Sequence, residues 1–169
     1  IRKRIENAVR ISKMRQKLYF YITSLSSLTV SYKGLLMPGQ LEGFFPDLKN
    51  SDIKSALCMV HSRYSTNTFP TWDLAQPFRF LAHNGEINTL RGNINWMQAR
   101  EALLSSELFG ASLKKIFPII VPGGSDSAAL DNVLELLVLS GRPIAQAMMM
   151  LIPVAWEQDA HLEKKLEGF

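Results

Sequence analysis

The hydrophobic period of this chain changes at Thr89, and that change constrains its fold more than any other feature. Before Thr89, apolar and β-branched residues form short runs of strand length, which glycine, proline and serine interrupt. After Thr89, apolar residues recur every three or four positions, as they do in helices that bury one face. Strands that come first and helices that follow them predict an α+β fold with antiparallel pairing, rather than alternating βαβ units.

The short apolar runs predict strands. Residues 19–24 and 28–33 are separated by serines and are spaced as a hairpin. Residues 55–61 and 78–83 are further runs of strand length, and residues 118–122 form a short β-branched run. The run that ends at His83 is followed by an Asn–Gly dipeptide, which tolerates positive φ and predicts a sharp turn.

Helical spacing predicts five helices, which cover residues 1–18, 39–48, 90–104, 128–139 and 143–152. Asn88 is the expected cap of the third helix, Asp126 or Ser127 is the expected cap of the fourth, and Pro153 ends the last. The first helix is already under way at Ile1, which is not a methionine. We therefore expect the chain to be an internal fragment of a longer protein.

The composition is that of one globular domain. Its 169 residues are 47% hydrophobic and 20% charged, which excludes low-complexity disorder. No stretch approaches the roughly 20 apolar residues of a membrane-spanning helix, so no membrane partner is expected. The single cysteine excludes an internal disulfide framework and fits a reducing, cytoplasmic compartment. No metal site is predicted, because His61, His83 and His161 lack a known ligand spacing.

The net charge of +4 is concentrated at one end of the chain. Residues 1–18 hold seven basic side chains and one acidic side chain, whereas the remainder holds twelve basic and fourteen acidic side chains. We interpret the basic segment as a solvated helix face rather than a polyanion site, because it lacks the interleaved aromatic residues that stack on bases. No nucleic acid is expected as a partner.

Polar clusters at residues 61–67, 83–86 and 123–127 lie at strand ends or helix starts, where functional sites are commonly built, although each alone also fits an ordinary turn. Arg63 can grip a carboxylate with two parallel hydrogen bonds, or form an internal ion pair. Asn84 and the Gly85 backbone N–H can form an oxyanion hole, or only a turn. Asp126 can bind an ammonium group, or only cap a helix.

Together these four residues describe a pocket for an α-amino acid whose side-chain carbonyl is attacked. No residue is an evident nucleophile for that attack. Cys58 lies within an apolar run and is predicted to be a buried thiol. A triad of Ser125, His83 and Asp126 can be drawn, but the Gly-x-Ser-x-Gly turn that would present the serine is absent.

Longer motifs surround the candidate residues, at positions 63–72, 74–77, 83–89 and 124–127, with Asp131. In these motifs, and over residues 19–156, the chain resembles the glutaminase domain of glutamate synthase large subunits. The wider class is the class II glutamine amidotransferases, whose nucleophile is an N-terminal cysteine. The Ser-Thr-Asn-Thr loop and the Asn-Trp-Met sequence at residues 95–97 favour glutamate synthase over its sister enzymes.

The resemblance implies a role for each candidate residue. Arg63 would bind the glutamine α-carboxylate, and Asp126 would bind its ammonium group. Asn84 and Gly85 would form the oxyanion hole. Thr66 would contact the substrate from a loop that closes over it.

The resemblance also implies a fold and a missing segment. The fold is the four-layer αββα sandwich of N-terminal nucleophile hydrolases, with mainly antiparallel sheets, of which residues 1–169 would form one partial domain. The attacking cysteine of this class uses its own α-amino group as the base, whereas residue 1 here is isoleucine. We therefore expect the N-terminal part of the domain, with its nucleophile, to be missing, and the chain alone to be inactive.

The implied parent enzyme would hydrolyse L-glutamine to L-glutamate and ammonia, and would use the ammonia with 2-oxoglutarate to make glutamate. FMN and an iron–sulfur cluster would belong to other domains of the same large subunit, with a small electron-donating subunit as a further partner. Another class II amidotransferase and a non-catalytic amino-acid-binding domain are the alternatives.

Overall fold

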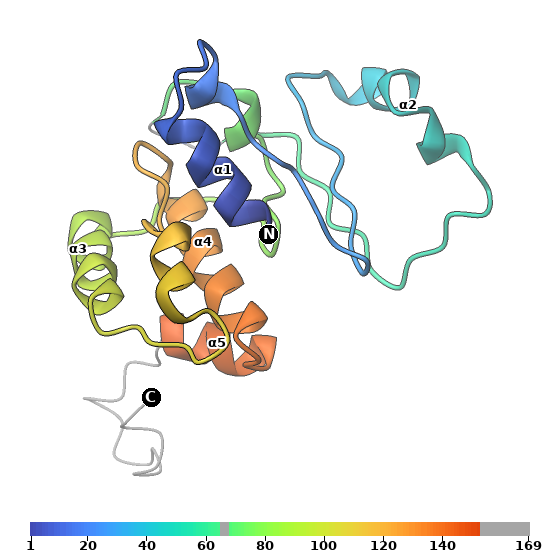
Figure 1. The fold of residues 1–169 in the computed structure, drawn as a ribbon. Coiled ribbons are helices and arrows are strands. Elements are labelled where there is room, and N and C mark those ends of the chain that lie inside the picture. The colour runs from blue at the N-terminus through green and yellow to red at the C-terminus, as the bar shows by residue number, and fades with distance from the viewer. Residues whose placement is uncertain (65–67, 153–169) are drawn as a thin grey trace, which may run out of the picture.

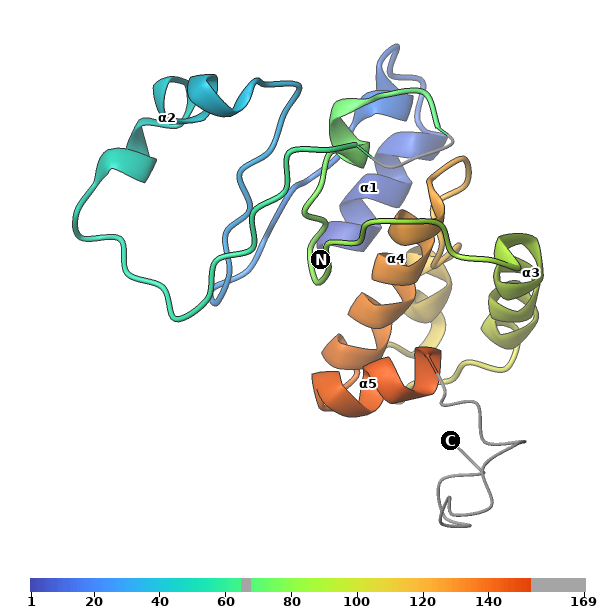
Figure 2. The same ribbon diagram turned by 180° about the vertical axis from the view of Figure 1, so that it is seen from behind.

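The computed structural model describes residues 1–64 and 68–152 and divides them into a helical body and an extended limb (Figure 1). The body contains α1 (Arg2–Ile11), α3 (Leu90–Glu101), α4 (Asp126–Leu139) and α5 (Ile144–Leu151). The limb, residues 22–61, carries the short helix α2 (Leu41–Phe44) away from the body in both views (Figures 1 and 2). Short 3₁₀ helices are η1 (Lys17–Tyr19), η2 (Pro38–Gln40), η3 (Pro46–Lys49), η4 (Trp72–Leu74) and η5 (Gly110–Ile116).

Helix α4 lies at the centre of the body because two apolar clusters cover different sides of it. One cluster joins α4 to α5 and to the loop that precedes α3, through Leu74, Phe78, Leu81, Leu134 and Ala147. The other joins α4 to α3 and to the segment that precedes α4, through Met97, Ile119, Ile120 and Ala129. No helix in the described ranges is long and apolar enough to cross a bilayer.

The predicted strands are wrong for the described residues, whose only β-bridge is the isolated antiparallel pair of Tyr64 and Ala75. In residues 118–122, side chains take the place of a neighbouring strand. The Ile119 N–H donates to a carboxylate oxygen of Glu101 at 2.6 Å, and the Val121 N–H donates to the Asn132 side chain at 2.9 Å. Backbone groups that are satisfied in this way have no need of a sheet.

In three other predicted strands, a side chain also accepts from one backbone N–H. In residues 19–24, the Ile22 N–H donates to Glu6 Oε1 at 2.9 Å. In residues 28–33, the Ser31 N–H donates to Ser24 Oγ at 3.2 Å, and in residues 78–83, the Phe80 N–H donates to Asp131 Oδ1 at 2.8 Å. The helical part of the α+β prediction is therefore confirmed. The described part of the chain contains neither the expected sheets nor the αββα sandwich.

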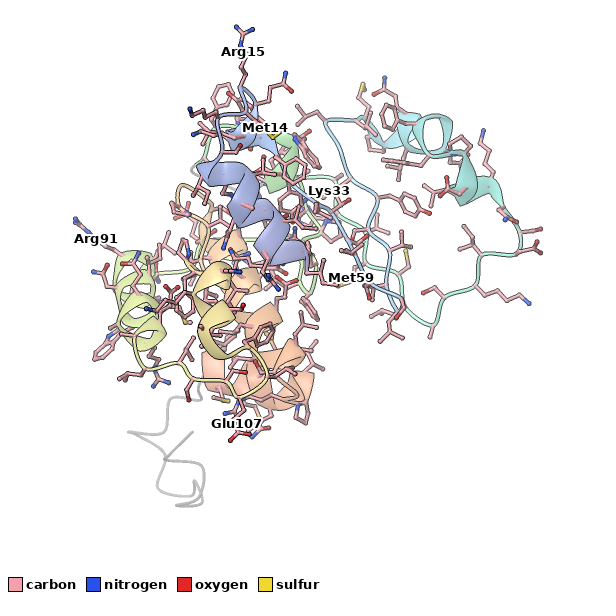
Figure 3. All side chains as sticks on the ribbon, in the orientation of Figure 1. Met14, Arg15, Lys33, Met59, Arg91 and Glu107 are labelled. Carbon is pink, nitrogen blue, oxygen red and sulfur yellow. The ribbon has the colours of Figure 1, made fainter. Side chains whose placement is uncertain are left out.

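Residues 55–61 depart from prediction in another way. This apolar run lies in the limb, where residues 55–60 are exposed. Cys58, which was expected to be buried, is exposed, and Met59 retains 43% of its accessible surface (Figure 3). The run lacks burial because it lies outside both apolar clusters of the body.

The predicted helices after Thr89 are confirmed in α3, α4 and α5, with shifted ends. Thr89, in the left-handed region at φ 57°, precedes α3 where Asn88 was expected to cap it. Ser125 caps α4, and its Oγ accepts from the Ala128 N–H at 3.1 Å. The predicted helix 39–48 is broken into η2, α2 and η3, and Pro153 lies outside the described residues.

Helix α1 exposes the apolar face that its spacing predicts to be buried, and it covers part of the charged face that was predicted to be solvated. Ile1, which precedes the helix, and Ile11, its last residue, are 89% and 87% exposed, whereas Glu6 at its centre is 1% exposed. Basic residues share the covered face, so the segment is not simply a solvated basic surface. Lys3 donates to the Ile119 carbonyl oxygen at 2.7 Å, and burial lowers the pKa of Lys3 to about 8.

A buried network of charges explains this reversal. Glu6 forms ion pairs with Arg2 on its own helix and with Arg79 at 3.0 Å, and Arg2 forms a second ion pair with Glu135 of α4. Buried charges are stable only when they are paired, so Arg2 and Glu6 must face α4 and the loop that carries Arg79. The apolar side chains on the other side of α1 are therefore left exposed.

Replacement of Glu6 by alanine is expected to lower the free energy of unfolding by about 3–5 kcal/mol, because it leaves buried cations without their partner. Ile11→Ala, on the exposed side of the same helix, is the matched control and is expected to change stability by no more than about 0.5 kcal/mol. Urea unfolding of both variants measures the difference. Equal losses would contradict a stabilising role for the network.

Candidate active site

A narrow cleft brings together residues that are distant in the sequence. It is lined by Arg63, Tyr64, Gln76, His83, Asn84 and Gly85, and it is a shallow surface depression rather than an enclosed cavity. Three residues that the sequence singled out for one site, Arg63, Asn84 and Gly85, therefore lie on the same cleft. Asp126 is not among the lining residues, and Thr66 lies outside the described residues.

Gln76 shapes the cleft by closing the loop that ends at Asn84. Its Oε1 accepts from the His83 N–H at 2.7 Å, and its Nε2 donates to the His83 carbonyl oxygen at 2.9 Å. Within this loop, the Phe78 N–H donates to the Leu81 carbonyl oxygen at 2.9 Å. Gln76 is only 6% exposed, so its amide replaces the hydrogen bonds that a neighbouring strand would have made.

Asn84 and Gly85 form the sharp turn that their sequence predicts. Gly85 has φ 117°, in the left-handed region that favours glycine. The Asn84 Oδ1 lies 2.8 Å from the His61 Nε2, so a residue of the returning limb contacts the turn. This turn exposes the Asn84 side chain on the cleft rather than burying it.

Asp126 links the same turn to the start of α4. Its Oδ2 accepts from the Ile87 N–H at 2.6 Å, and its Oδ1 accepts from the Ser127 N–H at 2.6 Å. The Ser127 hydroxyl also donates to Oδ1, at 3.1 Å. Asp126 is the first residue of α4 and not its cap, which is Ser125, and its hydrogen bonds to Ile87 and Ser127 fix the position of its carboxylate.

The triad of Ser125, His83 and Asp126 is not assembled. Ser125 Oγ accepts from the backbone of α4, and the His83 Nδ1 lies 3.2 Å from the Oγ of Ser127 instead. The Asp126 carboxylate accepts from the Ser127 hydroxyl at 3.1 Å, so Ser127, and not Ser125, lies between His83 and Asp126. These contacts make His83 and Ser127 part of the packing between the loop and α4.

Arg63 lacks the internal ion pair that was its alternative. In residues 1–64 and 68–152, the ion pairs involve only Arg2, Arg79, Glu6 and Glu135. The Arg63 guanidinium is exposed and lines the cleft. A guanidinium without a carboxylate partner is available to bind one from a ligand.

Lys33 and Asp131 form the buried polar support behind this region. Lys33, where the limb meets the body (Figure 3), donates to the carbonyl oxygens of Asp73 and Ala75 at 2.8 and 2.9 Å. Burial lowers the pKa of Lys33 to about 8 and raises the pKa of Asp131 to about 6. The other oxygen of Asp131, Oδ2, has no hydrogen-bond partner among residues 1–64 and 68–152.

Sequence reasoning missed Gln76 and His61. Gln76 belongs to a motif that was noted, but its seven-residue separation from His83 has no characteristic spacing. His61 belongs to the polar cluster at residues 61–67, but the sequence assigns it no role apart from that of a rejected metal ligand. No group of three potential metal-ligating side chains occurs among the described residues, and His161 lies outside them.

The chain belongs to the class II glutamine amidotransferases, because the family model for "Glutamine amidotransferases class-II" matches residues 1–169. This confirms the family that its motifs resemble. At the level of individual proteins, the chain is similar to glutamate synthases of bacteria, fungi and algae.

Three relatives illustrate that similarity. The chain is 53% identical over 169 residues to the glutamate synthase (NADPH) large chain of Bacillus subtilis (strain 168). The aligned region covers 100% of this chain and 11% of that protein. It is 55% identical over 148 residues to the glutamate synthase (NADH) of Saccharomyces cerevisiae, with coverage of 87% and 7%. It is 44% identical over 167 residues to the ferredoxin-dependent glutamate synthase of Pyropia yezoensis, with coverage of 99% and 11%. The chain thus spans about a tenth of the length of these relatives.

Replacement of Gln76 by alanine is expected to lower the free energy of unfolding by about 1–3 kcal/mol, because it leaves two backbone groups of His83 unsatisfied. Gln98→Ala, at an exposed position of α3, is the matched control and is expected to be nearly neutral. Chemical denaturation compares the two. A neutral Gln76→Ala would show that the loop closes without the amide.

Proposed function

We propose that this chain forms the glutaminase portion of a glutamate synthase large chain. The parent enzyme hydrolyses L-glutamine to L-glutamate and ammonia, and the ammonia is used with 2-oxoglutarate to make glutamate. The observation that carries the proposal is the convergence of Arg63, Asn84 and Gly85 on one cleft. The glutamate synthase names of the relatives support the particular enzyme.

Three residues are proposed to bind the substrate. Arg63 binds the α-carboxylate of glutamine through two parallel hydrogen bonds, and Asp126 binds its α-ammonium group. Each oxygen of the Asp126 carboxylate has more than one acceptor site, so the hydrogen bonds to Ile87 and Ser127 still allow such an interaction. Thr66 is proposed to contact the substrate from the neighbouring loop.

The reaction is an acyl transfer from the side-chain amide of glutamine. A thiolate attacks the amide carbon, and negative charge develops on its oxygen. The Asn84 side chain and the Gly85 N–H stabilise that oxyanion. The C–N bond then breaks, the nitrogen takes a proton and leaves as ammonia, and water hydrolyses the thioester to glutamate.

The attacking thiol is proposed to come from a part of the longer protein outside this chain. The single cysteine of the chain, Cys58, lies in the exposed limb and is not among the residues that line the cleft. In an N-terminal nucleophile hydrolase, the cysteine is the first residue of the mature protein. Its α-amino group, with an ordinary pKa of about 7.7–8.0, is suited to accept the thiol proton near neutral pH.

The remaining features of the parent enzyme are also proposals. We place the chain, as one partial domain over residues 1–169, in an αββα sandwich that other parts of the longer protein complete. One cysteine cannot supply the ligands of an iron–sulfur cluster, so the cluster is assigned to other domains, to which the resemblance also assigns FMN. A small electron-donating subunit and a cytoplasmic location complete the assignment.

In the full-length enzyme, Arg63→Lys is expected to raise the KM for glutamine by about 10–100-fold, because a lysine cannot reproduce the two-pronged grip on a carboxylate. The matched control is Arg91→Lys on α3, where the side chain extends away from the body (Figure 3). Steady-state glutaminase kinetics measure both. A KM unchanged by Arg63→Lys would remove Arg63 as the carboxylate ligand.

In the same enzyme, Asn84→Ala is expected to lower kcat by about 10²–10³ while KM changes little, because an oxyanion donor acts mainly in the transition state. Asn93→Ala, exposed on α3, is the control. Thermal melting and titration of active sites separate a catalytic loss from unfolding. A normal kcat per titrated site would reject the oxyanion assignment.

A further inference from the structure

His61 connects the two sides of the cleft. Its Nε2 lies 2.8 Å from the Oδ1 of Asn84, on the turn that ends the Gln76 loop. Its Nδ1 lies 3.0 Å from the backbone nitrogen of Arg63 and 2.9 Å from the Arg63 carbonyl oxygen. One imidazole therefore contacts both residues to which the proposed function gives the carboxylate and the oxyanion.

The Asn84 contact determines which nitrogen of His61 carries the proton. Nδ1 lies 3.0 Å from the Arg63 backbone nitrogen and 2.9 Å from the Arg63 carbonyl oxygen, so these two contacts are compatible with either tautomer. The Asn84 Oδ1 can only accept, so its contact with Nε2 selects the tautomer in which the Nε2–H donates to it. In that neutral imidazole, Nδ1 accepts from the Arg63 N–H.

This hydrogen bond fixes the orientation of the Asn84 carboxamide. Because its oxygen accepts from His61, a rotation that presented this oxygen to a ligand in the cleft would break the hydrogen bond. Its Nδ2 amino group, the only donor of that side chain, is left for the ligand. A rotated carboxamide would repel a developing oxyanion instead of stabilising it.

We propose that His61 is a positioning residue that holds Asn84 with its Nδ2 directed to the oxyanion. The proposal rests on the proposed function, because it needs the oxyanion role of Asn84. The contacts of His61 are at exposed positions, where a hydrogen bond adds little to folding stability. Its loss should therefore affect catalysis rather than the fold.

The test uses the full-length enzyme with His61→Ala, His61→Gln, Asn84→Ala and the double variant His61→Ala/Asn84→Ala. Ser62→Ala, at the exposed neighbouring position, is the matched control. Glutaminase kcat, glutamine KM and the melting temperature are measured for each. Glutamine at position 61 retains an amide N–H that can donate to Asn84, whereas alanine does not.

Three results are expected together. His61→Ala lowers kcat by about 10–100-fold with little change in KM or melting temperature, as expected when a reacting group is misplaced. His61→Gln restores much of that loss. His61→Ala has no further effect once Asn84 is alanine, because His61 acts through Asn84.

The inference and the proposed function fail in different ways. If Asn84→Ala lowers kcat but His61→Ala does not, or if the two losses add fully in the double variant, the positioning role is overturned and the oxyanion assignment stands. If Asn84→Ala leaves kcat unchanged, both are overturned. A lowered melting temperature for His61→Ala that His61→Gln does not relieve would assign His61 to the fold and overturn the inference.

Discussion

The buried carboxylate of Glu6 is the interaction on which the rest of the body depends. It pairs with Arg2 and Arg79 and accepts the Ile22 N–H, so it joins the first helix to the start of the limb and to the loop beside the cleft. Arg2 extends the network to Glu135 of the central helix. A buried charge that loses its partner is costly, and this cost makes the relative placement of these segments specific.

Side chains of α4 then position the cleft. Asp131 holds the Phe80 N–H inside the loop, and Asp126 holds the Ile87 N–H just after the turn. Between them, Gln76 fixes both backbone groups of His83. The Asn–Gly turn is thus bounded on each side by hydrogen bonds to buried or half-buried side chains, which gives an exposed turn a defined direction.

The sequence was informative where interactions are local and misleading where they are distant. The helices α3, α4 and α5 follow from spacing within a single segment. The strands do not, because backbone groups within them are satisfied by side chains from other segments, such as Asp131 for Phe80, 51 residues away. Likewise, Arg63 and the Asn84 turn could be assigned from their chemistry, whereas the contact of His61 with Asn84 spans 23 residues and has no sequence pattern.

The stability of the fold depends on pH through Asp131. Burial raises its pKa from 3.8 to about 6, so between these values the folded chain holds a proton that the unfolded chain has released. Folding is therefore linked to proton uptake in that interval, and the stability that this group contributes is complete below pH 3.8 and is lost as the pH rises through about 6. The carboxyl group that accepts from the Phe80 N–H must therefore carry a buried negative charge near neutral pH, and this charge lowers the free energy of unfolding.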